Sequence, residues 1–209
     1  MNRTGQIGRA GASPDRRRSH RTGRRIGDAV RGLGFLSVIG AGVWFGAPEF
    51  LGFVVVLGGV LVPRLMRLAG PFDAAFGITV LVAAWSGAAG LYEAIPWWDL
   101  LVHFITAGAA AAVLYLGLAR IDVTPDTPMG SVLPYRSIVV LTSALGMTLA
   151  VLWEFLEWAG HTFVSSQIHV GYTDTLGDLA VGGLGSTLAG ILLAQWQGRV
   201  SEVQSWARA

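Results

Sequence analysis

An apolar stretch of the chain contains three ionisable side chains of a kind that membrane-spanning helices ordinarily exclude. In VLWEFLEWAGH (residues 151–161), Glu154, Glu157 and His161 stand among hydrophobic residues. At 100° per residue, the three lie within about 60° of one another on one helix face. An ionised carboxylate inside a membrane costs on the order of 2.5 to 3.5 kcal/mol even on the mildest scale. The stretch therefore indicates a site that supplies a cation, bound protons or water.

Two other apolar segments begin with comparable pairs. Asp99 and His103 are four residues apart, and this spacing places both on one face of a helix. Asp174 and Asp178 have the same spacing at the start of the last apolar segment. Taken alone, Asp174 could be a helix N-cap and His103 a hydrogen-bonded residue at the membrane interface. Taken together, the patches on three segments favour a functional site.

The elements that carry these patches follow from composition and segment length. Hydrophobic residues make up 53% of the 209-residue chain and charged residues 13%, against about 25% charged in a typical soluble domain. A span needs roughly 20 apolar residues. The segments that qualify lie at about 30–47, 49–66, 73–94, 98–119, 136–159 and 174–195. The expected fold is all-α, a polytopic transmembrane helical bundle of about six spans; a five-span chain, with the first two segments fused or one of them lying in the interface, is the alternative.

The positive charge is carried by arginine alone and is distributed unevenly. Residues 1–31 contain nine arginines against Asp15 and Asp28, a charge of +7, while the remaining six arginines face eleven acidic residues. With six spans, every later arginine falls on the side of the basic tail. The positive-inside rule then predicts that both termini are cytoplasmic and that the acidic and histidine patches lie in the outer half of the membrane.

Three regions are expected along the chain. Residues 1–28 have too few apolar side chains to order themselves and are predicted to form a disordered, Arg-rich cytoplasmic tail. Residues 29–197 form the transmembrane helical domain, and residues 198–209 a short cytoplasmic C-terminal tail. The arginines favour anionic lipid headgroups, and no nucleic-acid partner is expected because no recognition module accompanies them. The sequence has no cysteine, which excludes disulfides and thiolate chemistry.

Small residues recur every four positions in the last apolar segment. Gly182, Ser186 and Gly190 share one face, and Gly185 and Ala189 have the same spacing. Such a pattern lets helices approach closely, so it predicts a packing face and not a pore.

The charge balance narrows the chemistry of the patches. They contain five carboxylates, no arginine lies in that half of the predicted topology, and only His103 and His161 could supply positive charge. Carboxylate and imidazole together suit Zn²⁺, Mn²⁺ or Fe²⁺, whereas Mg²⁺ or Ca²⁺ favours carboxylates alone. The spacing E-x-x-E-x-x-x-H matches no strong metal signature. A protonatable or polar substrate site without metal is therefore an open alternative.

Several motifs resemble known membrane proteins. WEFLE at 153–157 and DTLGDL at 174–179, followed by Gly185, resemble the YjdF-type family of bacterial inner-membrane proteins. DLLVHF at 99–104 is similar to the D-x-x-x-H-F of VanZ-like proteins, which are linked to glycopeptide resistance. The resemblance covers about residues 97–195 and implies a multi-pass protein of the bacterial inner membrane.

Two positions depart from this resemblance. His161 stands where a YjdF-like protein would have an aspartate, which keeps a group able to bind a ligand but changes its charge. Gly182 replaces an aspartate, or the asparagine of VanZ-like proteins. The departures imply that the site is reduced or retuned in this chain.

Three functions are consistent with these observations. The first is a metal-assisted hydrolase or transferase acting on a lipid or lipid-linked substrate, with His161 or Asp99 as general base. Its metal or proton site would be formed by His103, Glu154, Glu157, Asp174 and Asp178. The second is a proton- or cation-coupled transporter; the chain is small and lacks an internal repeat, for which a homo-oligomer could compensate. The third is a noncatalytic envelope factor that binds an amphiphile, as the VanZ-like resemblance implies. Serine catalysis is not expected, because no G-x-S-x-G motif is present.

Overall fold

A computed structural model describes residues 14–121, 123–124, 135–166, 168 and 170–206. Over these ranges the secondary structure is α-helical and contains no strand. The helices are α1 (Pro14–Trp44), α2 (Ala47–Leu65), α3 (Gly70–Ala88), α4 (Leu91–Ala94), α5 (Trp98–Arg120), α6 (Tyr135–Phe163) and α7 (Tyr172–Trp206). All but the short α4 are long and apolar enough to cross a membrane. The expected all-α polytopic bundle is confirmed, with six candidate spans.

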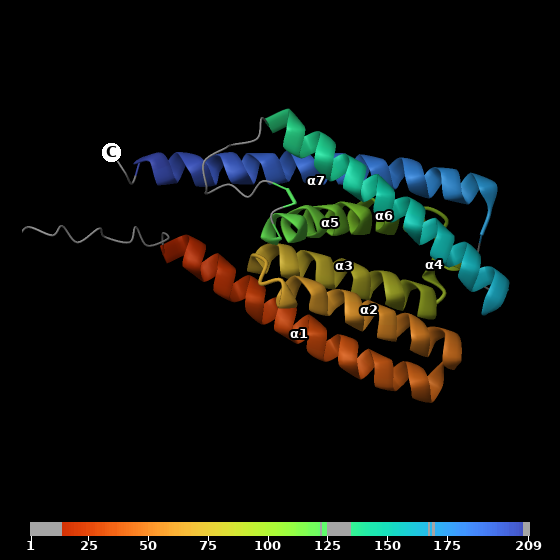
Figure 1. Ribbon diagram of the computed structural model, residues 1–209. Helices are drawn as coiled ribbons and strands as arrows, with labels where there is room; N and C mark the ends of the chain where they lie inside the picture. Colours follow the sequence, from red (N-terminus) through yellow and green to blue (C-terminus); the bar gives the residue numbers. More distant parts are fainter. Residues whose placement is uncertain (1–13, 122, 125–134, 167, 169, 207–209) are drawn as a thin grey trace, which may run out of the picture.

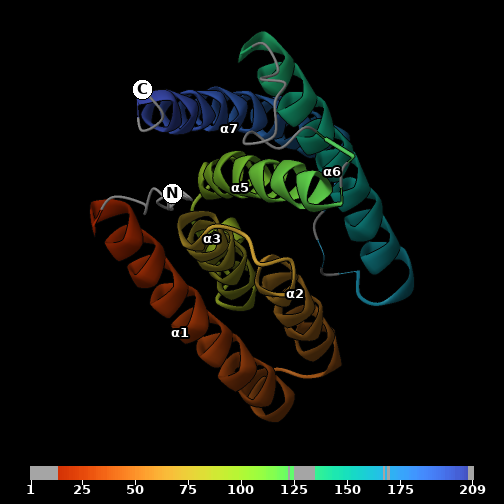
Figure 2. The same ribbon diagram turned by 60° about the vertical axis from the view of Figure 1, so that its left-hand side comes forward.

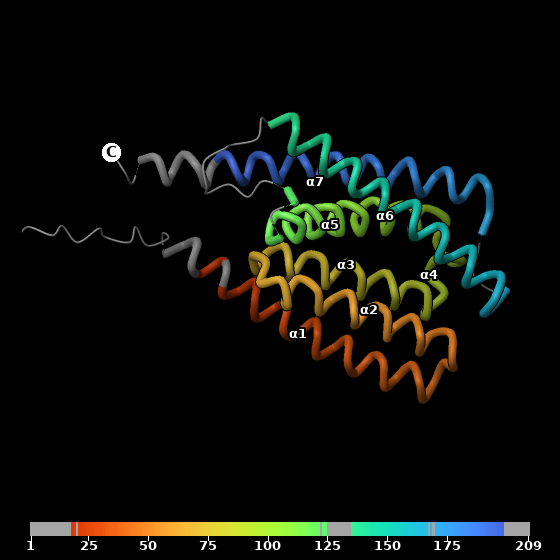
Figure 3. Tube along the Cα trace, viewed as in Figure 1, coloured from red at the N-terminus to blue at the C-terminus, as the bar shows by residue number. Residues whose placement is uncertain are grey.

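The long helices run back and forth in two groups (Figure 1). Helices α1, α2 and α3 pack together, helices α5, α6 and α7 form the second group, and contacts between α3 and α5 join the two. Figure 2 shows α1 and α6 at opposite edges, with α3 and α5 between them. Figure 1 shows that α1 begins and α7 ends at the same end of the bundle, and the Cα trace in Figure 3 shows the path of the chain between them. Each group has its own apolar core, around Phe53 and Val60 in the first and around Tyr115 and Leu193 in the second.

The first helix begins earlier than the sequence predicts. Helix α1 starts at Pro14, so residues 14–28 are helical and do not form a disordered tail, while residues 1–13 lie outside the described ranges. Packing explains part of the difference. The α carbon of Gly23 lies so close to the backbone of Gly70 that a Cβ there would overlap it, and Asp28 pairs with Arg31. These contacts order a segment whose composition alone suggests disorder.

Two further boundaries differ from those expected. The third segment, predicted at 73–94, is divided, because α3 ends at Ala88 and Gly90 adopts a φ of 67° before α4. That left-handed conformation favours glycine and stops a helix. At the other end of the chain, α7 continues to Trp206, through residues expected to form the C-terminal tail. The hairpin between α1 and α2 is as tight as predicted, with Pro48 in the first turn of α2.

An ion cluster ties the first three helices together where α2 ends and α3 begins. We call its members, Asp28, Arg31, Arg64 and Asp73, the basic-end cluster. Arg31 Nη1 lies 2.7 Å from Asp73 Oδ1, and Arg31 Nη2 lies 2.7 Å from Asp28 Oδ1. Arg64 Nε is 3.5 Å from the same oxygen of Asp28. The Asp73 side chain is only 3% exposed, and its charge is matched by an arginine that bonds both of its oxygens.

Glycines let α7 lie directly against α5 and α6. A Cβ on Gly185 would overlap the carbonyl oxygen of Phe104, and a Cβ on Gly108 would lie 2.7 Å from the carbonyl oxygen of Gly185. On the α6 side, a Cβ on Gly146 would overlap the fully buried Ser186. The small-residue face predicted for the last span is therefore confirmed as a packing face.

Candidate functional site

The site is positioned by two helices that begin side by side. Helices α5 and α7 both start at the end of the bundle opposite the basic-end cluster (Figure 1). Asp99 lies in the first turn of α5 and Asp174 in the first turn of α7, where free N–H groups and the helix dipole stabilise a carboxylate. The start of α5 is anchored to α3, because the indole nitrogen Nε1 of Trp98 donates a hydrogen bond of 2.8 Å to Ser86 Oγ.

Three of the predicted residues meet at this point. We call Asp99, His103 and Asp178 the acidic-histidine cluster; one ligand-type atom from each lies within 4.8 Å of the other two. His103 Nε2 is 3.5 Å from Asp99 Oδ1, and His103 Nδ1 is 3.7 Å from Asp178 Oδ1. An N–H···O hydrogen bond spans about 2.7 to 3.2 Å. The imidazole thus stands between two carboxylates without hydrogen-bonding to either of these oxygens.

Asp178 is the most enclosed member of the cluster. Its side chain is 2% exposed, and its Oδ1 atom, which faces His103, has no hydrogen-bond partner in the structure. Leaving a buried polar atom unsatisfied costs about 1 to 3 kcal/mol, and more for a charged group. A bound cation at this position would remove that cost.

The other predicted carboxylates surround the cluster. Glu157 accepts a hydrogen bond from the Trp153 side chain and interacts electrostatically with Asp99 and Asp178. Glu154 and Asp174 both act electrostatically on Asp178. All of these groups are acidic, and neither residues 68–119 nor residues 137–198 contain an arginine or a lysine. The negative charge of the site therefore has no basic side chain from these segments to balance it.

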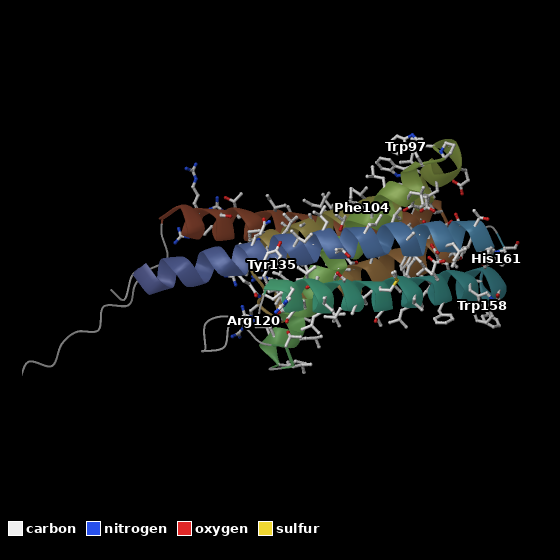
Figure 4. All side chains as sticks on the ribbon, turned by 90° about the horizontal axis from the view of Figure 1, so that it is seen from above. Trp97, Phe104, Arg120, Tyr135, Trp158 and His161 are labelled. Carbon is white, nitrogen blue, oxygen red and sulfur yellow. The ribbon has the colours of Figure 1, made fainter. Side chains whose placement is uncertain are left out.

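His161 lies apart from the cluster. Its side chain is exposed, and its Nδ1 atom is 2.6 Å from the carbonyl oxygen of Ile168 in the loop before α7. Figure 4 places His161 and Trp158 near the end of α6, at the same end of the bundle as Trp97. The contact with Ile168 holds the imidazole toward the loop.

Tyr92, on the short helix α4, was not among the predicted site residues. Burial raises the pKa of its phenol, and the carboxylates of Asp99 and Glu157 raise this pKa further, which places the ring within their field. The hydroxyl donates a hydrogen bond of 2.9 Å to the carbonyl oxygen of Ala83. The sequence offered one signal, since Gly90 and Pro96 bracket this residue and could have marked a break in the third span.

The donor set of the cluster fits a divalent transition metal. Metal–ligand distances of about 2.0 to 2.2 Å place neighbouring ligand atoms of a tetrahedral site about 3.4 Å apart. The separation of His103 Nδ1 from Asp178 Oδ1, 3.7 Å, is close to that value. The 3.5 Å contact with Asp99 Oδ1 is made by the other ring nitrogen, Nε2, and one ion would bind only one of these two nitrogens. Two carboxylates and an imidazole suit Zn²⁺, Mn²⁺ or Fe²⁺ and leave positions open for water or substrate.

The members of the acidic-histidine cluster are not the residues that the sequence predicted as metal ligands in every case. Asp99, predicted as a general base, belongs to the set with metal-ligand spacing. Glu154 and Glu157, predicted as ligands, lie outside that set, and the described residues contain no second group with ligand atoms so close together. His103 and Asp178 are in the set as expected.

The chain was compared with protein families, with curated proteins and with solved structures. Neither the curated proteins nor the solved structures contain a match. A family model described as "Predicted membrane protein (DUF2238)" matches residues 31–199, which include all six candidate spans for most of their length. YjdF-type proteins belong to this same family, so that resemblance is confirmed. The chain is a member of the DUF2238 family of multi-pass membrane proteins.

Proposed function

We propose that this protein is a metal-dependent hydrolase or transferase that acts on a lipid or lipid-linked substrate in the membrane. Asp99, His103 and Asp178 would hold a divalent transition metal. One observation carries the proposal: a carboxylate oxygen of Asp178, buried and without a hydrogen-bond partner, faces an imidazole at a distance typical of two ligands on one ion.

A purely structural role for the cluster is less well supported. A structural ion pair or hydrogen bond would bring His103 within about 3.2 Å of its partners, as charge-assisted bonds are short. The longer separations leave the carboxylates apart from the imidazole, and no arginine or lysine of the surrounding spans neutralises them. A divalent ion would supply positive charge between the carboxylates and a partner for the unsatisfied Oδ1 atom of Asp178.

The surrounding residues have distinct roles in this proposal. A bound metal would lower the pKa of a coordinated water to near neutrality. Glu157, which is close enough to Asp99 and Asp178 to interact with both, would accept the proton from that water. Trp153 positions the Glu157 carboxylate through its hydrogen bond. His161, tied to Ile168, would lie at the rim of the site, away from the reacting atoms.

A membrane substrate is favoured by the position of the site. The acidic-histidine cluster lies near the start of α5 and α7, two candidate spans, and would therefore lie near a membrane interface. Helix α6 exposes Trp153, Leu156 and Trp158. These side chains would contact the acyl or polyprenyl part of a substrate while its head group enters the cluster. The distribution of arginine supports an orientation with the site on the outer face of a bacterial inner membrane.

The packing beneath the site disfavours a transporter. A coupled transporter needs access to the site from both sides of the membrane. Below the cluster, α7 lies against α5 at Gly185 and Gly108, and against α6 at Gly146, with no room for even a methyl group. This contact supports access from one side only, as an enzyme at the membrane surface requires.

Metal loading tests the proposal directly. The purified full-length protein would be stripped with a chelator, loaded with Mn²⁺, and desalted; the metal would then be quantified by mass spectrometry and examined by pulsed electron paramagnetic resonance. We expect near-stoichiometric Mn²⁺ with a coupling to imidazole nitrogen from His103. Asp178→Asn and His103→Ala should lose the metal, and His103→Ala the nitrogen coupling.

A matched control and a turnover assay complete the test. Glu49→Gln removes a carboxylate at the same end of the bundle but in α2, and should keep full metal loading. The metal-loaded protein would also be incubated with a total membrane lipid extract, and the products compared with those of Asp178→Asn by mass spectrometry. Metal that binds equally well to Asp178→Asn would overturn the site, and a bound metal without any change in the extract would overturn the enzymatic role.

A further inference from the structure

We infer that the first turns of α1 bind anionic phospholipid head groups, through Arg18, Arg21 and Arg25, in the leaflet on the side of the basic-end cluster. The sequence predicts only a general attraction between a disordered tail and such lipids. The structure adds a defined surface, because residues 14–28 continue α1 as a helix. This surface lies at the other end of the bundle from the acidic-histidine cluster, so the inference does not depend on the proposed function.

One face of this extension is packed against the start of α3. A Cβ on Gly23 would overlap the backbone of Gly70, and a Cβ on Gly27 would lie 2.7 Å from Asp73 Oδ2. Both of these α1 glycines are buried. Rotation of the extension about its axis would bring larger side chains against the start of α3. The glycine contacts therefore determine which face of the extension points away from the bundle.

The arginines lie on that outward face. At 100° per residue, Arg18, Arg21 and Arg25 fall within about 60° of one another and nearly opposite Gly23 and Gly27. All three side chains are exposed. Figure 1 shows the first turns of α1 projecting beyond the ends of α2 and α3, so neither helix covers this face.

The charge of these arginines is not matched by the acidic residues nearby. Among the described residues, the ion pairs at this end join the two aspartates of the basic-end cluster to its own two arginines, and none includes Arg18, Arg21 or Arg25. A guanidinium group binds phosphate oxygens through two parallel hydrogen bonds. An anionic phospholipid therefore complements this face in both charge and hydrogen bonding.

The same face of α1 is apolar and exposed further along the span. It contains three large side chains that are 51 to 67% exposed, each following one of the arginines by 18 positions, or five turns at 3.6 residues per turn: Leu36, Ile39 and Val43. Lipids whose acyl chains contact these residues lie on the side of α1 that contains the arginines. The head groups of the leaflet at that end would meet the guanidinium groups directly.

Helix length places the arginines at the depth of the head groups. Trp44, at the other end of α1, is exposed, and tryptophan is enriched at membrane interfaces. Counted from Trp44, the roughly 20 residues that cross the hydrocarbon reach Arg25. At 1.5 Å per residue, Arg21 lies about 6 Å further out and Arg18 about 10 Å. The head-group layer is about 5 to 8 Å deep, and the long side chain of Arg18 can extend back into it.

The test compares two lipids that have the same acyl chains and differ in head-group charge. Dioleoyl phosphatidylglycerol and dioleoyl phosphatidylcholine would be titrated into the full-length protein in detergent, and bound lipid would be counted by native mass spectrometry. We expect phosphatidylglycerol to bind at least about tenfold more tightly.

Variants identify the residues responsible. Arg21→Gln should weaken phosphatidylglycerol binding about fivefold, and Arg18→Gln/Arg21→Gln/Arg25→Gln at least about tenfold, with phosphatidylcholine binding unchanged. Arg136→Gln is the matched control, because it removes one exposed arginine from the first turn of α6, at the opposite edge of the bundle (Figure 2). It should change binding less than about twofold. If the triple variant does not give a monodisperse, helical protein, Arg21→Gln against Arg136→Gln decides.

Three outcomes would overturn the inference. The first is equal binding of the two lipids, or a preference that the arginine variants of α1 retain. The second is an equal loss in Arg136→Gln, which would show a general attraction of this side of the protein and no surface on α1. The third concerns nucleic acid: a single-stranded oligonucleotide should not displace bound phosphatidylglycerol, and displacement at a concentration below that of the lipid would assign the arginines to nucleic acid instead.

Discussion

The two polar clusters of this protein lie at opposite ends of the bundle and contain similar residues in different arrangements. In the basic-end cluster, Arg31 bonds both oxygens of the buried Asp73, with a shortest distance of 2.7 Å. In the acidic-histidine cluster, the corresponding contacts of His103 are 3.5 and 3.7 Å, and one oxygen of Asp178 has no hydrogen-bond partner. Both clusters bury an aspartate, but only the first supplies a permanent cation to match it.

If the proposed function is correct, this difference separates a structural cluster from a ligand-binding one. A buried aspartate whose charge is matched within the fold stabilises the arrangement of α1, α2 and α3 and has no capacity left for a ligand. A buried aspartate whose charge is unmatched destabilises the protein until something binds. The same residue type should therefore respond in opposite ways when its charge is removed at the two ends.

The largest expected effect is at the basic-end cluster. Arg31→Met leaves Asp73 buried without a cation, and breaking a buried ion pair in this way costs about 3 to 5 kcal/mol of unfolding free energy. Asp178→Asn should leave the thermal midpoint of metal-free protein unchanged or raise it, because it removes an unmatched charge. Both would be followed by thermal unfolding in detergent.

The most exposed member of the basic-end cluster provides the control. Asp28 has a side chain that is 55% exposed, so Asp28→Asn should cost less than about 1 kcal/mol. A loss of stability for Asp178→Asn as large as that for Arg31→Met would show that both clusters are structural, and the contrast between them would then fail.

A divalent metal should stabilise the protein through the acidic-histidine cluster and not through the basic-end cluster. At a free metal concentration of about 100 times the dissociation constant, binding to the native state adds about 2.7 kcal/mol. Mn²⁺ should therefore raise the thermal midpoint of the wild type, and a chelator should reverse this rise. His103→Ala should abolish the response, whereas Asp28→Asn should keep it. A response that is retained in His103→Ala would place the metal elsewhere.

A third prediction concerns the close packing of α7 against α5 beneath the acidic-histidine cluster. Gly185→Ala would force a methyl group into the Phe104 carbonyl, and overpacking of this kind costs about 1 to 3 kcal/mol. Gly58→Ala, in α2, meets nothing within 4 Å and should stabilise the protein by up to about 1 kcal/mol through helix propensity. Opposite shifts in the thermal midpoint would confirm that α5 and α7 are in close contact. Equal shifts would contradict it.

The spans and the faces of single helices could be predicted well from the sequence. Segment length located the six candidate spans, and the four-residue spacing placed Asp99 with His103 on one face of α5. Both features depend on local periodicity, which a single sequence contains. The small residues of α7 were likewise assigned to packing from their spacing alone.

Contacts between distant residues could not be predicted in the same way. Arg31 was only counted with the positive charge of residues 1–31, and its ion pair was not predicted, because its partner Asp73 lies 42 residues away. Asp99 forms a cluster with Asp178 and not with Glu154, although Glu154 is closer to Asp99 in the sequence. The reason is that α5 and α7 begin side by side while α6 passes outside them. Which helix ends meet is decided by packing in three dimensions, and no periodicity in one segment encodes it.

The smallest expected effect concerns Tyr92, which lies in the electrostatic field of Asp99 and hydrogen-bonds to α3. Burial raises the pKa of this phenol above that of the unfolded chain, so the neutral form stabilises the fold at pH values below about 10 and the stabilisation is lost as the pH rises further. Tyr92→Phe removes the hydrogen bond to Ala83 and should cost about 0.5 to 1.5 kcal/mol at neutral pH. It should also remove this part of the alkaline loss of stability. Unfolding measured from pH 7 to 11 in both proteins would show the two stability curves converging as the pH rises, whereas parallel curves would contradict a raised pKa at Tyr92.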